Sequence, residues 1–186
     1  SQVRGSEEAI TRTQRSFEHL FQRPDADHLS VDTSATRLSG TGGTVAIGNF
    51  DGDWVFETGP TFRSPGLEIN DIGFINNTEQ VNFFAWGARR WRNPTKVFNR
   101  FQWNHNVYAG WDWSGAALNR SYNTNFWGQF KNFSNFNFFL NLEQQDISRN
   151  ALRGGPLFRR PPGFALGGGI GTDQRKKLRA FLFFNG

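Results

Sequence analysis

The chain has 186 residues, of which 37% are hydrophobic, 20% charged and 16% aromatic, and its net charge is +5. This length suits one domain, no window approaches the ~18 uninterrupted apolar residues of a membrane-spanning helix, and 21 Phe with 7 Trp exclude a disordered chain. Because cysteine is absent, disulfide bonds and thiolate metal sites are excluded as well.

The first 43 residues are predicted to form a short helix followed by an irregular segment. Ser6 is a good N-cap, two acidic residues follow it, and apolar residues then recur near one helical face. Because Pro24 disfavours helical backbone at the residue before it, we expect the helix over 6–22. Residues 25–43 are rich in Asp, Ser, Thr and Gly, which predicts an irregular connection.

From Thr44 onward, apolar and polar residues alternate with a period of two, which predicts an all-β region over 44–186. In the clearest stretch, 101–113, every second residue is apolar except His105, and the residues between them are polar almost throughout. We expect eight strands, at 44–49, 54–63, 79–91, 98–113, 121–131, 135–144, 164–171 and 177–185.

The connections between these strands alternate strictly between short and long. Four are short and turn-like, at 51–52, 93–96, 132–134 and 172–175. Three are longer and irregular, at 64–78, 114–121 and 145–163. In an antiparallel up-and-down meander, all short turns then lie at one end of the sheet and all long loops at the other.

Short turns at one end, long loops at the other and an apolar/polar repeat are typical of a transmembrane β-barrel of the outer-membrane type. The 13 residues from Phe101 to Trp113 would span ~43 Å and, tilted by ~40°, cover ~33 Å along the membrane normal. That suffices for the hydrocarbon layer. A soluble jelly roll or lectin sandwich also alternates and stays open as the alternative.

Four sequence runs carry a resemblance to a known family: RPDADH (23–28), SPGLEINDIGF (64–74), RGGPLFRRP (153–161) and DQRK (173–176). In this order they resemble the barrel domain of a family of large, uncharacterised bacterial outer-membrane proteins. In that family the barrel follows a module similar to family-9 carbohydrate-binding domains. The resemblance covers residues 6–180 and implies a barrel in the bacterial outer membrane, but it transfers no catalytic or ligand-binding residue.

The chain has no methionine and opens without a basic and apolar leader, so we expect a mature form or a piece of a longer protein. Its last residues, Asn185-Gly186, resemble a hairpin turn whose second strand is missing. An unpaired apolar edge is not tolerated in lipid. We therefore expect further strands beside 44–49 and 177–185, from the same polypeptide or from another subunit, and no closed barrel from these residues alone.

The longest predicted loop carries four arginines that are candidate ligand-binding residues, Arg149, Arg153, Arg159 and Arg160. Guanidinium groups recognise phosphate and carboxylate, so lipopolysaccharide phosphate or an acidic glycan is one interpretation. The other is that these arginines pair with acidic residues of neighbouring loops and hold the loop in place. The second interpretation is favoured.

Three further clusters have simple structural interpretations, which are favoured over functional ones. Asp25, Asp27 and His28 could hold a metal ion, but adjacent residues rarely converge on one centre, so a capped turn is expected. Glu68 and Asp71 could act as an acid/base pair, but a turn-stabilising role is expected. Glycines 167–171 lack the strand-loop-helix context of a phosphate loop and are expected to relieve crowding beside aromatic side chains.

The sequence thus predicts a non-enzymatic outer-membrane protein with no catalytic residue, metal or cofactor, in a transport, anchoring or surface-assembly role. Its expected partners are outer-membrane lipid and lipopolysaccharide, a glycan facing the polar strand faces, and other subunits. His105 is expected at an interface, because it breaks an apolar strand face. The alternative is a soluble all-β carbohydrate-binding module. A nucleic-acid binder ranks last, because no clustered basic stripe or RNA-binding motif is present.

Overall fold

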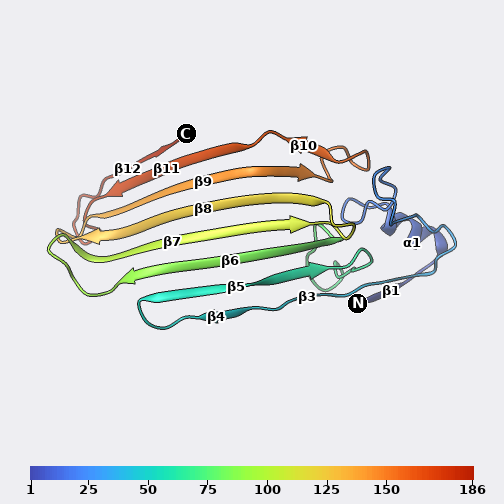
Figure 1. The fold of residues 1–186 in the computed structure, drawn as a ribbon, viewed down its shortest axis with the longest axis horizontal. Helices are drawn as coiled ribbons and strands as arrows, with labels where there is room; N and C mark the ends of the chain where they lie inside the picture. The colour runs from blue at the N-terminus through green and yellow to red at the C-terminus, as the bar shows by residue number, and fades with distance from the viewer.

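The computed structural model describes residues 1–186 as one large antiparallel sheet with a small N-terminal unit at one end (Figure 1). Neighbouring strands in the sheet are neighbours in sequence, which makes it a meander. The sheet is open, because its two edges do not pair with each other. Its strands are β3 (Gly42–Thr44), β4 (Ile47–Asn49), β5 (Trp54–Arg63), β6 (Gln80–Trp91), β7 (Phe98–Trp111), β8 (Ala117–Phe130), β9 (Asn135–Ser148), β10 (Phe158–Arg160), β11 (Gly163–Gly171) and β12 (Phe181–Asn185).

Prolines explain why ten strands stand where eight were predicted. β3 and β4 both pair with β5, and between them the Val45 amide donates to the Pro60 carbonyl at 3.0 Å. Pro60 has no N–H to return that bond, so the ladder is interrupted there. In the same way, β10 and β11 both pair with β9 and are separated by Pro161 and Pro162. The prediction of an all-β antiparallel sheet with one short helix is confirmed.

The predicted boundaries are wrong in three connections. The loop expected at 114–121 is a five-residue turn, because Asp112 Oδ1 accepts from the Ser114 amide and hydroxyl and from the Ala116 amide at 2.6–2.9 Å. The loop expected at 145–163 shrinks because β9 continues to Ser148 and pairs with β10. The last strand begins at Phe181 rather than at 177, and residues 172–180 form the connection from β11.

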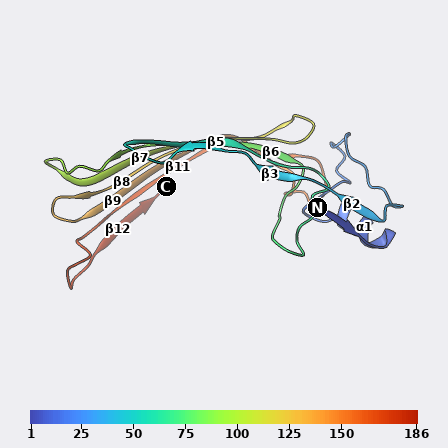
Figure 2. The ribbon, with the colours of Figure 1, turned by 90° about the horizontal axis from the view of Figure 1, so that it is seen from below.

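The connections lie at the two ends of the sheet as predicted, but their lengths do not alternate strictly, because the connection 172–180 is longer than the turn 112–116 at the opposite end. The connections β4–β5, β6–β7, β8–β9 and β11–β12 all lie at one end, which we call the turn end (Figure 1, left). The connections 64–79, 112–116 and 149–157 lie at the other end, called the loop end, beside the N-terminal unit. In the perpendicular view of Figure 2 the sheet is a single curved layer, and the N-terminal unit lies beyond its end rather than over a face.

The N-terminal unit is more structured than its composition predicted. Its helix α1 covers Glu7–Gln14 only, with Ser6 Oγ accepting from the Ala9 amide, so the expected helix over 6–22 is too long. Leu20 has a φ of 52°, which no right-handed helix contains. The segment expected to be irregular holds β2 (Arg37–Ser39), which pairs with β1 (Gln2–Arg4).

Gln14 shows how the chain after the helix is held. Its buried side-chain amide donates to the Asp32 carbonyl at 3.0 Å and accepts from the Asp32 amide at 2.7 Å. A side chain thus replaces a strand partner, which a reading of periodicity does not detect. The fully buried apolar residues concentrate in this unit and in the loop 64–79, and include Ile10, Leu20, Ala26, Leu38, Leu67 and Ile75. No helix in the structure has the length and hydropathy to cross a membrane.

The pairing register gives the large sheet two chemically different faces, since residues directly opposite each other share a face. Ala85, Val107 and Tyr122 lie in one row, and Leu142 extends it. We call this side the aromatic face; its larger apolar residues include Trp54, Phe56, Phe83, Trp91, Phe101, Trp103, Val107, Phe126, Phe136, Phe138, Leu142, Phe164, Ile170, Leu182 and Phe184. The opposite side, the amide face, includes Gln102, Asn104, Asn106, Asn123, Asn125, Asn137 and Asn141.

Candidate functional site

The aromatic face is uncovered. No second layer lies over it, and large apolar side chains remain exposed along its whole width, from Ile47 at 70% through Val107 at 43% to Phe164 at 69%. Soluble monomers rarely expose a continuous apolar surface of this extent, and such surfaces mark contact with lipid or another protein. The aromatic face is therefore the first candidate for a functional surface.

Aromatic rings concentrate toward the turn end of this face. Phe98, Phe130 and Phe136 form a cluster with ring centroids 4.7–5.5 Å apart, and Phe101 stacks on Phe98 at 5.7 Å. Trp91 continues the cluster, 4.9 Å from Phe101. These separations fall in the range of favourable aromatic pairing. The β-strands here end in a band of packed rings, before the short turns begin.

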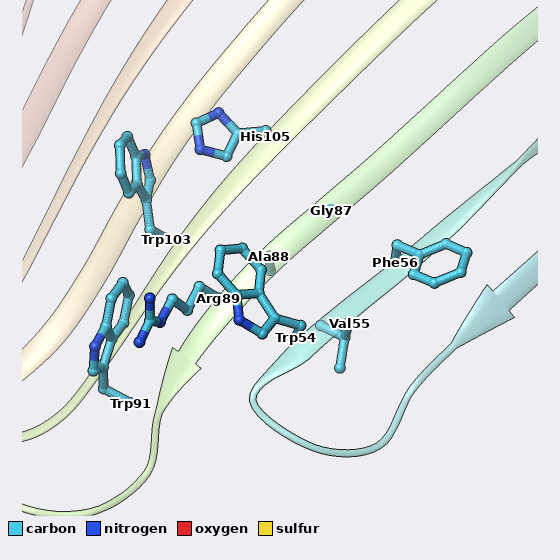
Figure 3. A pocket seen from close by; sticks show the side chains of 9 residues that line it. All are labelled: Trp54, Val55, Phe56, Gly87, Ala88, Arg89, Trp91, Trp103 and His105. Carbon is cyan, nitrogen blue, oxygen red and sulfur yellow. The ribbon is translucent and has the colours of Figure 1, made fainter.

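A cavity of about 360 Å³ opens on the aromatic face across β5, β6 and β7 (Figure 3). Its walls include Trp54, Trp91 and Trp103, and Gly87 leaves room at its base. Arg89 extends between two of these rings, with Cζ 5.0 Å from the Trp54 centroid and 4.8 Å from the Trp91 centroid. Its guanidinium makes no salt bridge and no hydrogen bond to the protein, so its donors are free for a ligand.

His105, which also lines this cavity, has a partner within the chain. Its Nδ1 lies 2.6 Å from the hydroxyl of Tyr122 on β8, and its ring is 4.6 Å from that of Trp103. Trp103 Nε1 in turn donates to Thr124 Oγ1 at 2.8 Å. The polar atoms on this face are thus bonded to one another, which lowers the cost of placing them in an apolar environment.

The amide face is bonded to itself across four strands. Asn104 donates to Asn125 Oδ1 at 2.9 Å, and Asn106 donates to Asn123 Oδ1 at 2.7 Å. Asn123 donates to Asn141 Oδ1 at 2.5 Å and accepts from Asn125 at 2.7 Å. Asn104 is buried although no layer covers it, because Gln102 and Trp86 donate to its Oδ1. The side-chain N–H groups of this network thus donate to other side chains of the same face.

The four arginines considered as ligand-binding residues do not form one site. Arg149 is buried and bonds Glu79, whereas Arg160 bonds Asp146 at 3.0 Å near the surface. Both line a polar cavity of about 260 Å³ at the loop end. Arg159 is exposed, and Arg153, with a φ of 49°, lines a different cavity. Burial lowers the pKa of Arg149, although the neighbouring carboxylate of Glu79 acts to raise it. A ligand role for these arginines stays a prediction.

The residues that sequence analysis missed form a buried cluster, the Glu79 junction, between the N-terminal unit and the loop end. The fully buried carboxylate of Glu79 accepts from Arg23 at 3.0 Å, Arg149 at 3.0 Å and His28 at 2.5 Å. Its partners lie 51–70 residues away in sequence, so spacing carries no signal for it. Of these residues, sequence analysis noted only Arg23 and His28, as members of the run 23–28.

Three of the four runs that carry the family resemblance contact one another through the N-terminal unit. Asp25 Oδ2 accepts from the Leu157 amide, which joins the runs 23–28 and 153–161. His19 bonds the Pro65 carbonyl at 2.8 Å and Glu68 at 3.0 Å, which joins the unit to the run 64–74. Burial acts to raise the pKa of Glu68, but bonds from the Asn70 amide and His19 prevail and lower it. The runs are thus packing motifs of the junction.

Glu68 and the glycines have the structural roles expected of them, whereas Asp25 and His28 differ from the expected capped turn. The Asp25 carboxylate accepts from the Leu157 amide and His28 bonds Glu79, so both side chains bond distant partners rather than capping a local turn. Glu68 accepts from the Asn70 amide at 2.7 Å and stabilises a turn. A Cβ at Gly167 would lie 2.6 Å from the ring of Phe139, so glycine relieves crowding there, as expected.

Comparison with known proteins finds one match. The model of a family described as a domain of unknown function (DUF5916) matches residues 7–185. No curated protein and no solved structure matches the chain.

Proposed function

The chain belongs to the DUF5916 family, whose description assigns no function, and from that starting point we propose that it forms part of the wall of a β-barrel in the bacterial outer membrane, where it serves as a non-enzymatic anchor. One observation carries the proposal. The sheet exposes its apolar face and satisfies its polar face internally, which is the reverse of a soluble sheet and the arrangement of a barrel wall between lipid and lumen.

Strand length supports the same conclusion. β7, β8 and β9 each have 14 residues. At ~3.3 Å per residue and a tilt of ~40°, such a strand covers ~35 Å along the membrane normal. The hydrocarbon layer is ~30 Å thick, so the band of rings at the turn end would lie at its boundary. The length of the strands and the position of the ring band therefore both suit a sheet that spans a membrane.

The open edges of the sheet require partners under this proposal. β12 pairs only with β11, and β3 and β4 pair only with β5. Unpaired backbone groups in hydrocarbon cost several kcal/mol each. Further strands, from the same polypeptide or another subunit, therefore complete the wall at both edges.

A pair of adjacent substitutions tests which face meets lipid. Val107 lies on the aromatic face and Tyr108 on the amide face, and their exposures are similar, 43% and 48%. In vesicles of bacterial phospholipid, Val107→Arg is expected to cost ~2–4 kcal/mol of unfolding free energy, because a lipid-facing charge is desolvated. Tyr108→Arg is expected to cost less than ~1 kcal/mol, since that face is polar. Equal costs, or a protein that is monodisperse without detergent, would contradict the proposal.

The two ends of the sheet should face opposite sides of the membrane. In outer-membrane barrels the long loops are extracellular and the short turns periplasmic. Single cysteines at Ser114, at the loop end, and at Asn132, at the turn end, are therefore expected to differ in labelling by an impermeant thiol reagent. In intact cells only the cysteine at position 114 should react. Equal labelling of both positions would overturn this orientation.

The alternative, a soluble carbohydrate-binding module, has one observation in its favour. The cavity of Figure 3 combines tryptophan rings with a free guanidinium, which could stack on and hydrogen-bond a sugar. It is less favoured because apolar residues are exposed across the entire face, far beyond that cavity. Glycan binding by detergent-free monomers would select this alternative.

A further inference from the structure

Charge is almost excluded from the aromatic face of β5–β9, where the two exceptions are both arginines. Within the strands β5–β9, Arg89 lies on this face in the row of Trp54 and Trp103, and Arg120 lies in the row of Ala109. Arg89 is two residues before the last residue of β6 at the turn end, and Arg120 is near the beginning of β8 at the loop end. No acidic side chain lines the cavity around Arg89.

The cavity at Arg89 has the form of a site for an amphiphile. Trp54 and Trp91 flank the guanidinium and orient it through cation–π contact, while its N–H groups have no partner in the protein. Phe56 and Trp103 supply apolar walls toward the middle of the sheet. A free cation at one end and an apolar groove beside it match an anionic head on an acyl chain.

We propose that this cavity binds one glycerophospholipid, with Arg89 donating to the phosphate diester and an acyl chain lying over Gly87 between Phe56 and Trp103. This inference rests on the proposed membrane function and deepens it by naming the ligand. Planar guanidinium is the cation best suited to bond two phosphate oxygens at once. The turn end is the proposed periplasmic end, and tryptophan and arginine gather at the level of the headgroups.

Gly87 is the position from which the cavity can be closed without damage to the fold. A Cβ there would meet only the Val55 carbonyl, at an ordinary distance of 3.9 Å, and its φ is not in the left-handed region. Gly87→Leu is therefore expected to fill the cavity while the strand stays paired. Arg89→Leu removes the cation and keeps the face apolar, and Arg120→Leu is the matched control at the other end.

The experiment is native mass spectrometry of the full chain purified in a phosphate-free detergent and supplied with phosphatidylglycerol. The unmodified protein is expected to retain one phospholipid. Arg89→Leu is expected to weaken its binding by about tenfold, because a charge-assisted bond is lost. Gly87→Leu is expected to weaken binding as well, because its side chain occupies the space of the acyl chain. Arg120→Leu should retain the lipid. Retention by Arg89→Leu equal to that of the unmodified protein would overturn the site, as would displacement by excess inorganic phosphate, which indicates a free-anion site.

The failure of this site and that of the proposed function give different results. A protein that inserts into vesicles and shows the Val107/Tyr108 asymmetry but retains no phospholipid refutes the site alone. A protein that stays monodisperse without detergent refutes the proposed function and with it the lipid site. Circular dichroism of each variant in detergent verifies that its strand content is unchanged, so lost retention is assigned to the cavity.

Discussion

The N-terminal unit and the large sheet are stabilised in opposite ways. The unit buries apolar residues such as Ile10 and Leu38 and closes on the buried carboxylate of Glu79. The sheet has few buried apolar residues, exposes its aromatic face and depends on backbone ladders and an amide network. The unit is thus built to be stable in water. Under the proposed function, lipid covers the aromatic face of the sheet and stabilises it there.

The largest expected effect is at the Glu79 junction, where the two regions meet. Glu79→Ala removes the carboxylate that bonds the buried guanidinium groups of Arg23 and Arg149 and leaves Arg23 only Asp25, at 3.8 Å, so it is expected to cost ~3–5 kcal/mol. Hydrogen exchange of residues 1–40 measures this loss. Asp146→Ala is the control, because its pair with Arg160 is near the surface and is worth less than ~1 kcal/mol.

Exchange of 1–40 that responds equally to the two substitutions would mean that the unit is held by apolar packing rather than by the junction. Loss of protection over the entire large sheet as well would show that the two regions do not unfold separately.

A smaller effect is expected within the amide network of the sheet. Asn123→Ala removes bonds to Asn106, Asn125 and Asn141 and leaves polar atoms of half-buried side chains unpaired, at ~1–3 kcal/mol. Unfolding in lipid vesicles by urea measures it. Asn137→Ala, on the same face but with no side-chain hydrogen bond, should change stability by less than ~0.5 kcal/mol. Similar costs at both positions would show that water replaces the network freely.

The smallest expected effect is the loss of stability of the N-terminal unit at acidic pH. Because the pKa of Glu68 is lower in the folded protein than its ordinary 4.5, its contribution is complete above that value and is lost as the pH falls through the folded pKa. The N-terminal unit is therefore expected to exchange faster at pH ~3 than at pH ~5, and Glu68→Gln to reduce this difference. At the turn end, Arg175 lowers the pKa of Asp173 to about 2, so that turn should withstand acid further. An acid response unchanged in Glu68→Gln would contradict this assignment.

Periodicity predicted the sheet because strand alternation is a local property. The register of β7 with β6 and β8 follows the apolar column from Phe101 to Trp111, since a slip by one residue would put the apolar side chains on the polar side. Strand ends were predicted less well. Asp112 ends β7 through hydrogen bonds to the turn that follows it, and Pro161 separates β10 from β11 where the two pair with β9. Both effects appear only once the partner strand is in place.

The candidate site was predictable in kind but not in position. The alternation over 101–113 indicated an apolar sheet face, and its tryptophans were visible in the sequence. Arg89 was not singled out, because nothing local places it between Trp54, 35 residues earlier in the chain, and Trp91 on its own strand. The loop arginines drew attention by their density, yet Arg149 and Arg160 are engaged by acidic residues.

The sequence by itself determined the strand repeat, the end of the sheet at which each connection lies and the two contrasting faces, because each follows from the alternation of neighbouring residues along the chain. Only the tertiary structure decided the fold of residues 1–40, the burial of Glu79 between Arg23, His28 and Arg149, and the cavity around Arg89. These depend on contacts between residues far apart in sequence, whose energy arises from burial and charge pairing that no local pattern records.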